Sequence, residues 1–197
     1  MTDIFAKLVF ALTLSVAPGP VNLITLSTGL NHGARSALGF VFGATAGFTL
    51  LLALIGLGAQ AVADQAQAVF DVLAVLGAGL ILYFGVGLLR SDGAQDAAAA
   101  PVPSAWQGAA LQWLNPKAWG ACLASVSLFD LQDSPGALWA FVAMYFVACF
   151  VGVGSWALFG AQAERWLNTA ARRRVFNRIL GSILCVMAAL FLLQGLR

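Results

Sequence analysis

Six long apolar stretches limit what this chain can fold into, because each is long enough to cross a membrane as a helix. A helix needs roughly 20 apolar residues to span the hydrocarbon core of a bilayer. Only 9% of the residues are charged, compared with about 25% in soluble domains. We therefore expect an all-α integral membrane protein with six transmembrane helices. The stretches cover residues 4–30, 35–62, 68–89, 106–128, 136–161 and 175–195.

Two of the six predicted helices are interrupted by proline. The run Pro18-Gly19-Pro20 interrupts the first helix, and the run Asn115-Pro116-Lys117 interrupts the fourth. A proline lacks an amide hydrogen and clashes with the carbonyl group four residues before it. Membrane transporters use such broken helices to line binding sites with the freed backbone groups. A packing kink is the alternative interpretation, but the pairing of two breaks favours a binding site.

The breaks supply the candidate substrate-binding residues. Freed carbonyl groups suit an ammonium group, and the N-terminus of a half-helix suits a carboxylate. A zwitterionic amino acid would use both. We expect both asparagines to cap the half-helices that follow the breaks and to offer polar groups to a substrate. The candidates are Pro18, Gly19, Pro20, Asn22, Asn115, Pro116 and Lys117.

Lys117 is the one charged residue deep in a predicted span. A charge at that depth is costly unless it faces a cavity or a partner. The alternative is that its side chain extends to the membrane interface. The predicted spans place no carboxylate near it, so its candidate partners are freed carbonyl groups, Asn22 or the carboxylate of a substrate.

The distribution of positive charge predicts the orientation in the membrane. If six helices alternate, seven arginines fall on one side and only Lys7 and Arg197 fall on the other. Cytoplasmic loops carry the excess of positive residues, so we expect both termini on the external, periplasmic side. Arg35 is a gate candidate, with a surface anchor as the alternative. The seven are Arg35, Arg90, Arg165, Arg172, Arg173, Arg174 and Arg178.

The chain divides into two halves of three predicted helices. Residues 1–90 form the first repeat, 91–104 a cytoplasmic linker, and 105–197 the second repeat. The first helix of each half has a proline break, and the third has a Leu-Gly pair, at Leu76-Gly77 and Leu180-Gly181. Three spans is an odd number, so the second half enters the membrane from the opposite side. We expect an inverted repeat.

Several classes of site are not expected. The three cysteines, at positions 122, 149 and 185, are isolated in apolar runs and give no redox or zinc-ligand spacing. We expect no metal site, no cofactor and no enzymatic activity. No basic stripe indicates nucleic acid. Gly39, Gly43 and Gly47 form a ridge of small residues that we assign to helix packing.

Together these motifs resemble the lysine-exporter (LysE/RhtB) superfamily of translocators, in order and over essentially the whole chain. The first-half motifs are Pro18-Gly19-Pro20 with Asn22, then Gly33-Ala34-Arg35 and the three glycines. The third helix runs from Leu76-Gly77 to Tyr83-Phe84-Gly85 and ends at Arg90. The second-half signature is Gln112-Trp113-Leu114-Asn115-Pro116-Lys117-Ala118-Trp119.

The resemblance implies an exporter of amino acids or their derivatives in a bacterial cytoplasmic (inner) membrane, driven by a proton or ion gradient. The Pro-Gly-Pro break is similar to that of the homoserine/threonine-type branch, although Val21 follows it where many members have an acidic residue or asparagine. The expected partners are an amino acid as substrate and the lipid bilayer, and a homodimer is left open. The alternatives are an ion or metal exporter of the same superfamily and a non-transporting membrane assembly factor.

Overall fold

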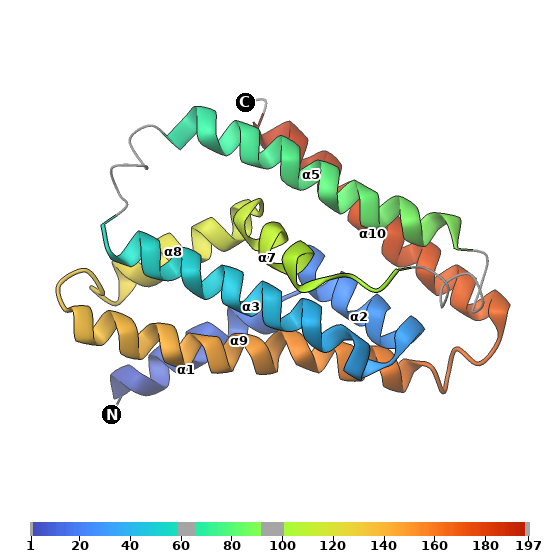
Figure 1. Cartoon of the computed structure of the whole chain (residues 1–197), viewed down its shortest axis with the longest axis horizontal. Helices are drawn as coiled ribbons and strands as arrows, with labels where there is room; N and C mark the ends of the chain where they lie inside the picture. The colour runs from blue at the N-terminus through green and yellow to red at the C-terminus, as the bar shows by residue number, and fades with distance from the viewer. Residues whose placement is uncertain (1, 59–65, 92–100, 196–197) are drawn as a thin grey trace.

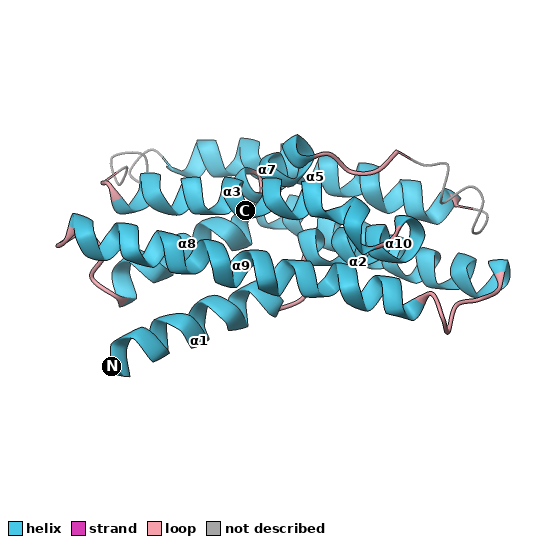
Figure 2. Ribbon diagram, turned by 60° about the horizontal axis from the view of Figure 1, so that its bottom comes forward, coloured by secondary structure: helices cyan, strands magenta, loops and turns pink. Residues whose placement is uncertain are grey.

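The computed structural model describes residues 2–58, 66–91 and 101–195, and it contains helices but no strand in these ranges. Figure 2 shows the helices running along one common direction, as in a bundle. The predicted all-α fold is therefore correct. In chain order the helices are α1 (Thr2–Val16), α2 (Pro20–His32), α3 (Ala34–Gly56), α5 (Ala66–Arg90), α7 (Ala105–Trp113), α8 (Pro116–Leu128), α9 (Pro135–Ala163) and α10 (Ala170–Gly195).

Three of these helices are long and apolar enough to cross a membrane, namely α3, α9 and α10. The pair α1 and α2 forms a fourth candidate span, bent by 63° at the first proline break. Within α5, Ala74–Arg90 forms a shorter apolar helix. These lengths agree with a helical membrane protein, and the total of six spans stays a prediction.

Both predicted breaks lie where the prolines stand. α1 ends at Val16 and α2 begins at Pro20, while α7 ends at Trp113 and α8 begins at Pro116. Each of these two prolines occupies the first turn of its new helix. A first-turn residue has no helical acceptor for its amide hydrogen, so the missing hydrogen costs nothing there. Local proline chemistry thus sets both breaks.

Three helix pairs approach closely at glycines. α3 packs against α7, α2 packs against α9, and α5 packs against α10. Figure 1 shows α5 and α10 side by side. A Cβ atom at Gly29 of α2 would overlap the backbone of Ala157 in α9. Gly85 of α5 and Gly181 of α10 face each other's carbonyl groups. Such contacts let helix backbones come together in a membrane protein.

The predicted glycine ridge on α3 is correct for two of its three members. Cβ atoms at Gly43 and Gly47 would overlap Ala105 and Ala109 of α7. A Cβ atom at Gly39 would meet nothing within 4 Å, so the packing role is wrong for this residue. Residues four apart on a helix are rotated by about 40°, and the ridge turns away from α7 toward its N-terminal end.

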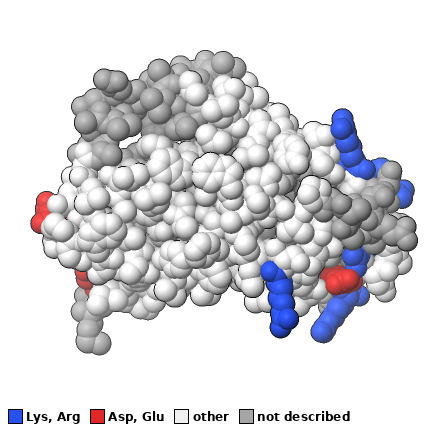
Figure 3. Space-filling model, in the orientation of Figure 1, with Lys and Arg blue, Asp and Glu red and all other residues white. Residues whose placement is uncertain are grey.

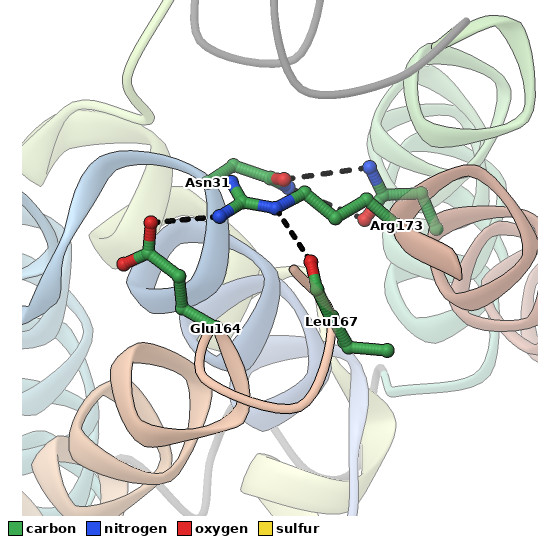
Figure 4. Close-up of polar contacts among 5 residues, drawn as sticks. Asn31, Glu164, Leu167 and Arg173 are labelled. Atoms are coloured by element: carbon green, nitrogen blue, oxygen red, sulfur yellow. Dashed lines mark hydrogen bonds and ion pairs between the residues drawn. The ribbon is translucent and has the colours of Figure 1, made fainter. Parts of the chain in front are cut away.

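Positive charge gathers at one end of the bundle. Figure 3 shows the Lys and Arg side chains of the visible face at the right-hand end, where α9 ends and α10 begins. In Figure 4, Arg173 pairs with Glu164 at 2.7 Å and donates from Nε to the carbonyl oxygen of Leu167 at 3.0 Å. We call this the arginine-rich end, and its assignment to the cytoplasm stays a prediction.

Candidate functional site

A small cavity lies between the two helix breaks and is here called the central cavity. Five of the predicted site residues line it, although the breaks are almost a hundred positions apart in the chain: Gly19, Pro20, Asn22, Asn115 and Lys117. Its volume of about 50 Å³ holds a few water molecules. Small-molecule sites usually measure at least about 300 Å³, so the surrounding helices must separate before a solute can enter.

Side chains satisfy the carbonyl groups that the first break frees. The last carbonyls of a helix have no donor within the helix. Asn22 donates from Nδ2 to the carbonyl oxygens of Ser15 at 2.9 Å and Ala17 at 2.8 Å. Trp156 of α9 donates from Nε1 to the carbonyl oxygen of Val16 at 3.1 Å. The broken end of α1 is therefore held by α2 and by α9.

Lys117 also reaches the broken end of α1, from the other break. Its Nζ donates to the carbonyl oxygen of Ala17 at 3.1 Å and lies 3.5 Å from that of Pro18. The C-terminus of a helix carries partial negative charge, which favours a cation. Of the partners expected for Lys117, the structure contains the freed carbonyl groups. The two breaks are thus joined by an ammonium group.

The capping prediction is correct for one asparagine and wrong for the other. Asn115 accepts a hydrogen bond at Oδ1 from the amide of Lys117 at 3.0 Å and so caps α8. The N-cap of α2 is Gly19, which makes no side-chain cap. Asn22 lies within the first turn of α2, so its amide reaches back to the end of α1 instead. Both asparagines are only 5% exposed.

Three predicted site residues lie outside the lining of the central cavity. Pro18 is exposed and contributes its carbonyl oxygen, while Pro116 is half-buried in the first turn of α8. Arg35 is exposed at the start of α3, and its role as a gate stays a prediction.

Several residues of the central cavity were not predicted from the sequence. Gln112 of α7 and Tyr145 of α9 line it, and they are 7% and 1% exposed. A signal was available, because each is a polar side chain within a long apolar stretch. Ser15, Phe48 and Cys149 also line the cavity, but their side chains are common in apolar helices and carry no comparable signal.

A row of aromatic rings fills the space on one side of the central cavity. It begins with the stacked pair Phe48 and Tyr145, whose ring centroids are 4.6 Å apart. It continues through Phe141 and Phe129 to Phe10 of α1, with successive centroids 5.6, 5.4 and 5.4 Å apart. The row leads toward the end of the bundle that carries the N-terminus.

Comparison with known proteins gives a family and several relatives. The family model for the LysE type translocator matches residues 12–195. The homoserine/homoserine lactone efflux protein of Salmonella typhimurium (strain LT2) is 30% identical over 92 residues, covering 47% of this chain and 45% of that relative. The cysteine/O-acetylserine efflux protein of Salmonella choleraesuis (strain SC-B67) is 26% identical over 181 residues, covering 91% and 92%. No solved structure matches the chain.

Proposed function

This chain belongs to the LysE type translocator family, and on that basis we propose that it exports small zwitterionic amino acids by gradient-driven secondary transport. The family makes it a transporter rather than an enzyme. Its relatives are named as efflux proteins for homoserine or homoserine lactone and for cysteine or O-acetylserine, three of which are amino acids. These three amino acids share a small, uncharged side chain. We propose the bacterial cytoplasmic membrane as the site of export.

The contact between Lys117 and the end of α1 carries this proposal. The Nζ atom of Lys117 lies 3.1 Å from the carbonyl oxygen of Ala17, beside the central cavity. An ammonium group is also one of the two charged groups of every zwitterionic amino acid. Lys117 therefore occupies, in this conformation, a position that suits the ammonium group of the substrate.

We infer that the substrate inserts into this contact. Its ammonium group would take the carbonyl oxygens of Ala17 and Pro18, and its carboxylate would pair with the displaced Lys117. The first amides of α2, at Val21 and Asn22, add donors without helical partners at the positive end of a helix dipole. Every charge then keeps a partner, which matters because an unpaired charge in the membrane interior costs about 2.5–3.5 kcal/mol or more.

We also infer that residues 1–90 and 105–197 form two inverted halves. If the halves are equivalent, the broken helix α1–α2 corresponds to α7–α8, α3 corresponds to α9, and α5 corresponds to α10. The packing of α2 on α9 then corresponds to the packing of α7–α8 on α3, and α5 and α10 pack on each other. These are the contacts expected when two copies of a three-helix unit are related by a twofold axis. The inferred orientation places the arginine-rich end in the cytoplasm and both termini outside.

The two lysines of the chain provide a matched test. We expect Lys117→Gln to weaken export of L-homoserine and O-acetyl-L-serine, whereas Lys7→Gln should behave like the wild type. Lys7 pairs with Asp3 at 2.7 Å on α1, lies over the ring of Phe129 and stands outside the central cavity lining. Lys117 is exposed in this conformation, and a hydrogen bond to a charged group contributes about 1.5–3 kcal/mol, which corresponds to about tenfold or more in affinity. Uptake into inside-out proteoliposomes measures the effect.

Two results would contradict the proposed function. If no amino acid moves in wild-type proteoliposomes, the chain is not an amino-acid exporter, and uptake assays with metal ions would then test the ion-exporter alternative. If amino acids move but Lys117→Gln transports them like Lys7→Gln, the proposed site is wrong. Dissipating the ion gradients with ionophores should stop uptake against a concentration gradient, since the proposed transport is secondary.

A further inference from the structure

A second, larger cavity lies at the arginine-rich end of α2 and is here called the end cavity. Its volume is about 270 Å³, close to the lower limit of about 300 Å³ for small-molecule sites. α2 contributes Ser27 and Asn31, α5 contributes Phe84 and Gly87, and α7 contributes Gln107. The end cavity can therefore hold a solute that the central cavity, in this conformation, cannot.

One wall of the end cavity is rich in hydrogen-bonding groups. Asn31 donates from Nδ2 to Ser27 Oγ at 3.1 Å and to Asn177 Oδ1 at 3.3 Å. Figure 4 labels Asn31 and draws hydrogen bonds of its side-chain amide as dashed lines. The fully buried Asn177 donates in return to Asn31 Oδ1 at 3.4 Å and to Ser91 Oγ at 3.4 Å. This network fixes the Asn31 side chain in the cavity wall, where hydroxyl and amide groups offer both donors and acceptors.

The chemistry of the lining selects for solutes without net charge. Among the described residues that line the end cavity, there is no Asp, Glu, Lys or Arg, and His32 is the basic side chain in that lining. The lining also includes the apolar side chains of Ile24, Phe84 and Leu88. A cationic side chain would find no carboxylate in this lining, and burying an unpaired charge is costly. The lining instead suits a molecule with balanced charges and a short, weakly polar side chain.

The two cavities follow the same two helices. α2 lines the central cavity with Asn22 and the end cavity with Asn31, and α7 does so with Gln112 and Gln107. At 1.5 Å per residue, Asn22 and Asn31 are roughly 13 Å apart along α2. Ile24 of α2, only 2% exposed, is buried between them. The aromatic row extends from the central cavity toward the opposite end of the bundle.

We propose that the end cavity is a second binding site, where an amino acid of zero net charge binds before it moves along α2 to Lys117. The proposal rests on the proposed function, because it assigns the same solute to both cavities. It adds a loading site and a preference for neutral over cationic amino acids. Ile24 separates the two sites and must move aside during transfer.

Two glycines of α5 allow the end cavity to be filled with a matched control. Gly87 lines the cavity, and Gly79 lies outside its lining on the same helix. A Cβ atom at either position would meet nothing within 4 Å. Gly87→Phe therefore occupies the cavity without backbone overlap, and Gly79→Phe adds the same ring elsewhere on α5. The smaller Gly87→Val serves as a second variant if Gly87→Phe does not fold.

Equilibrium dialysis of the purified full chain with radiolabelled L-homoserine tests the proposal. We expect the wild type and Gly79→Phe to bind two molecules per chain, and Gly87→Phe and Lys117→Gln to bind one each. L-Lysine should not compete at either site. In inside-out proteoliposomes, Gly87→Phe should raise the KM for L-homoserine at least about tenfold over Gly79→Phe, as expected for loss of substrate binding.

The outcomes separate the two proposals. One bound molecule in the wild type, lost in Lys117→Gln and kept in Gly87→Phe, would overturn the end-cavity site and leave the proposed function intact. Two molecules bound to a folded Gly87→Phe would overturn it as well. No binding and no transport of L-homoserine or O-acetyl-L-serine by the wild type would overturn the proposed function and the loading site together.

Discussion

The carbonyl oxygen of Ala17 receives two donors with different roles. Asn22 binds it at 2.8 Å and also binds Ser15, whereas Lys117 binds it at 3.1 Å and reaches Pro18 only at 3.5 Å. A carbonyl oxygen has two lone pairs and can hold both donors. The shorter bonds of Asn22 join two helices that are adjacent in the chain. We therefore assign a structural role to Asn22 and an exchangeable contact to Lys117.

Replacing Asn22 should destabilise the fold. Asn22→Leu keeps a similar volume but leaves the carbonyl oxygens of Ser15 and Ala17 without this donor. A buried polar group that loses its partner costs about 1–3 kcal/mol, so thermal unfolding in detergent should shift to lower temperature. The control is Asn168→Leu, because Asn168 is exposed and makes one long contact, at 3.4 Å, with Arg172. Equal unfolding temperatures for both variants would refute the structural role of Asn22.

At the scale of residues, the sequence predicts what depends on neighbours in the chain. Proline chemistry is local, so both break positions were correct. Asn115 stands directly before a proline at a helix start, and its capping role was also correct. The partners of Asn22 depend on the 63° bend between α1 and α2, which no local pattern specifies. The contact of Lys117 with Ala17 needs the packing of two distant helices and was foreseen only as one of three options.

At the scale of helices, the glycines of α3 predicted close packing but not the partner. A repeat of small residues indicates where another backbone can approach, and it contains no information about which helix does so. Gly43 and Gly47 approach α7, and Gly108 of α7 approaches Phe40 and Ala44 in return. α7 leads into the second break, so this contact helps to place Asn115 and Lys117 beside the end of α1.

The α3–α7 contact can be tested with one added methyl group. At Gly43, an alanine Cβ would overlap the backbone of Ala105, and overpacking of this kind costs about 1–3 kcal/mol. At Gly39, four residues earlier, an alanine meets nothing within 4 Å. Since alanine favours a helix over glycine by up to about 1 kcal/mol, Gly39→Ala should be neutral or stabilising. Thermal unfolding in detergent measures the change in unfolding temperature, which should be negative for Gly43→Ala and zero or positive for Gly39→Ala. A higher unfolding temperature for Gly43→Ala would contradict the close packing of α3 on α7.

At the scale of the whole molecule, two independent features support the same inverted arrangement. The first is the packing, in which α2 packs against α9 as α3 packs against α7, and the third helices of the two halves, α5 and α10, pack against each other. The second is the charge, which gathers at the end where α9 passes to α10 (Figure 3). If the second half enters the membrane from the opposite side to the first, each half must cross the membrane an odd number of times. The central cavity lies between the broken helices of the two halves, where both can change its shape.

Reporter fusions test the inferred crossings directly. We expect green fluorescent protein, which fluoresces in the cytoplasm, to be bright when fused after Ser91 and dark when fused after Arg197. Alkaline phosphatase, which is active only outside the cytoplasm, should give the opposite pair of results. The physical reason is that three spans separate the N-terminus from Ser91 and three more follow, with the arginines of the α9–α10 connection held inside. If both fusion points lie on the same side, the second half has an even number of spans. The inverted arrangement would then be wrong, and the two breaks would enter the membrane from the same side.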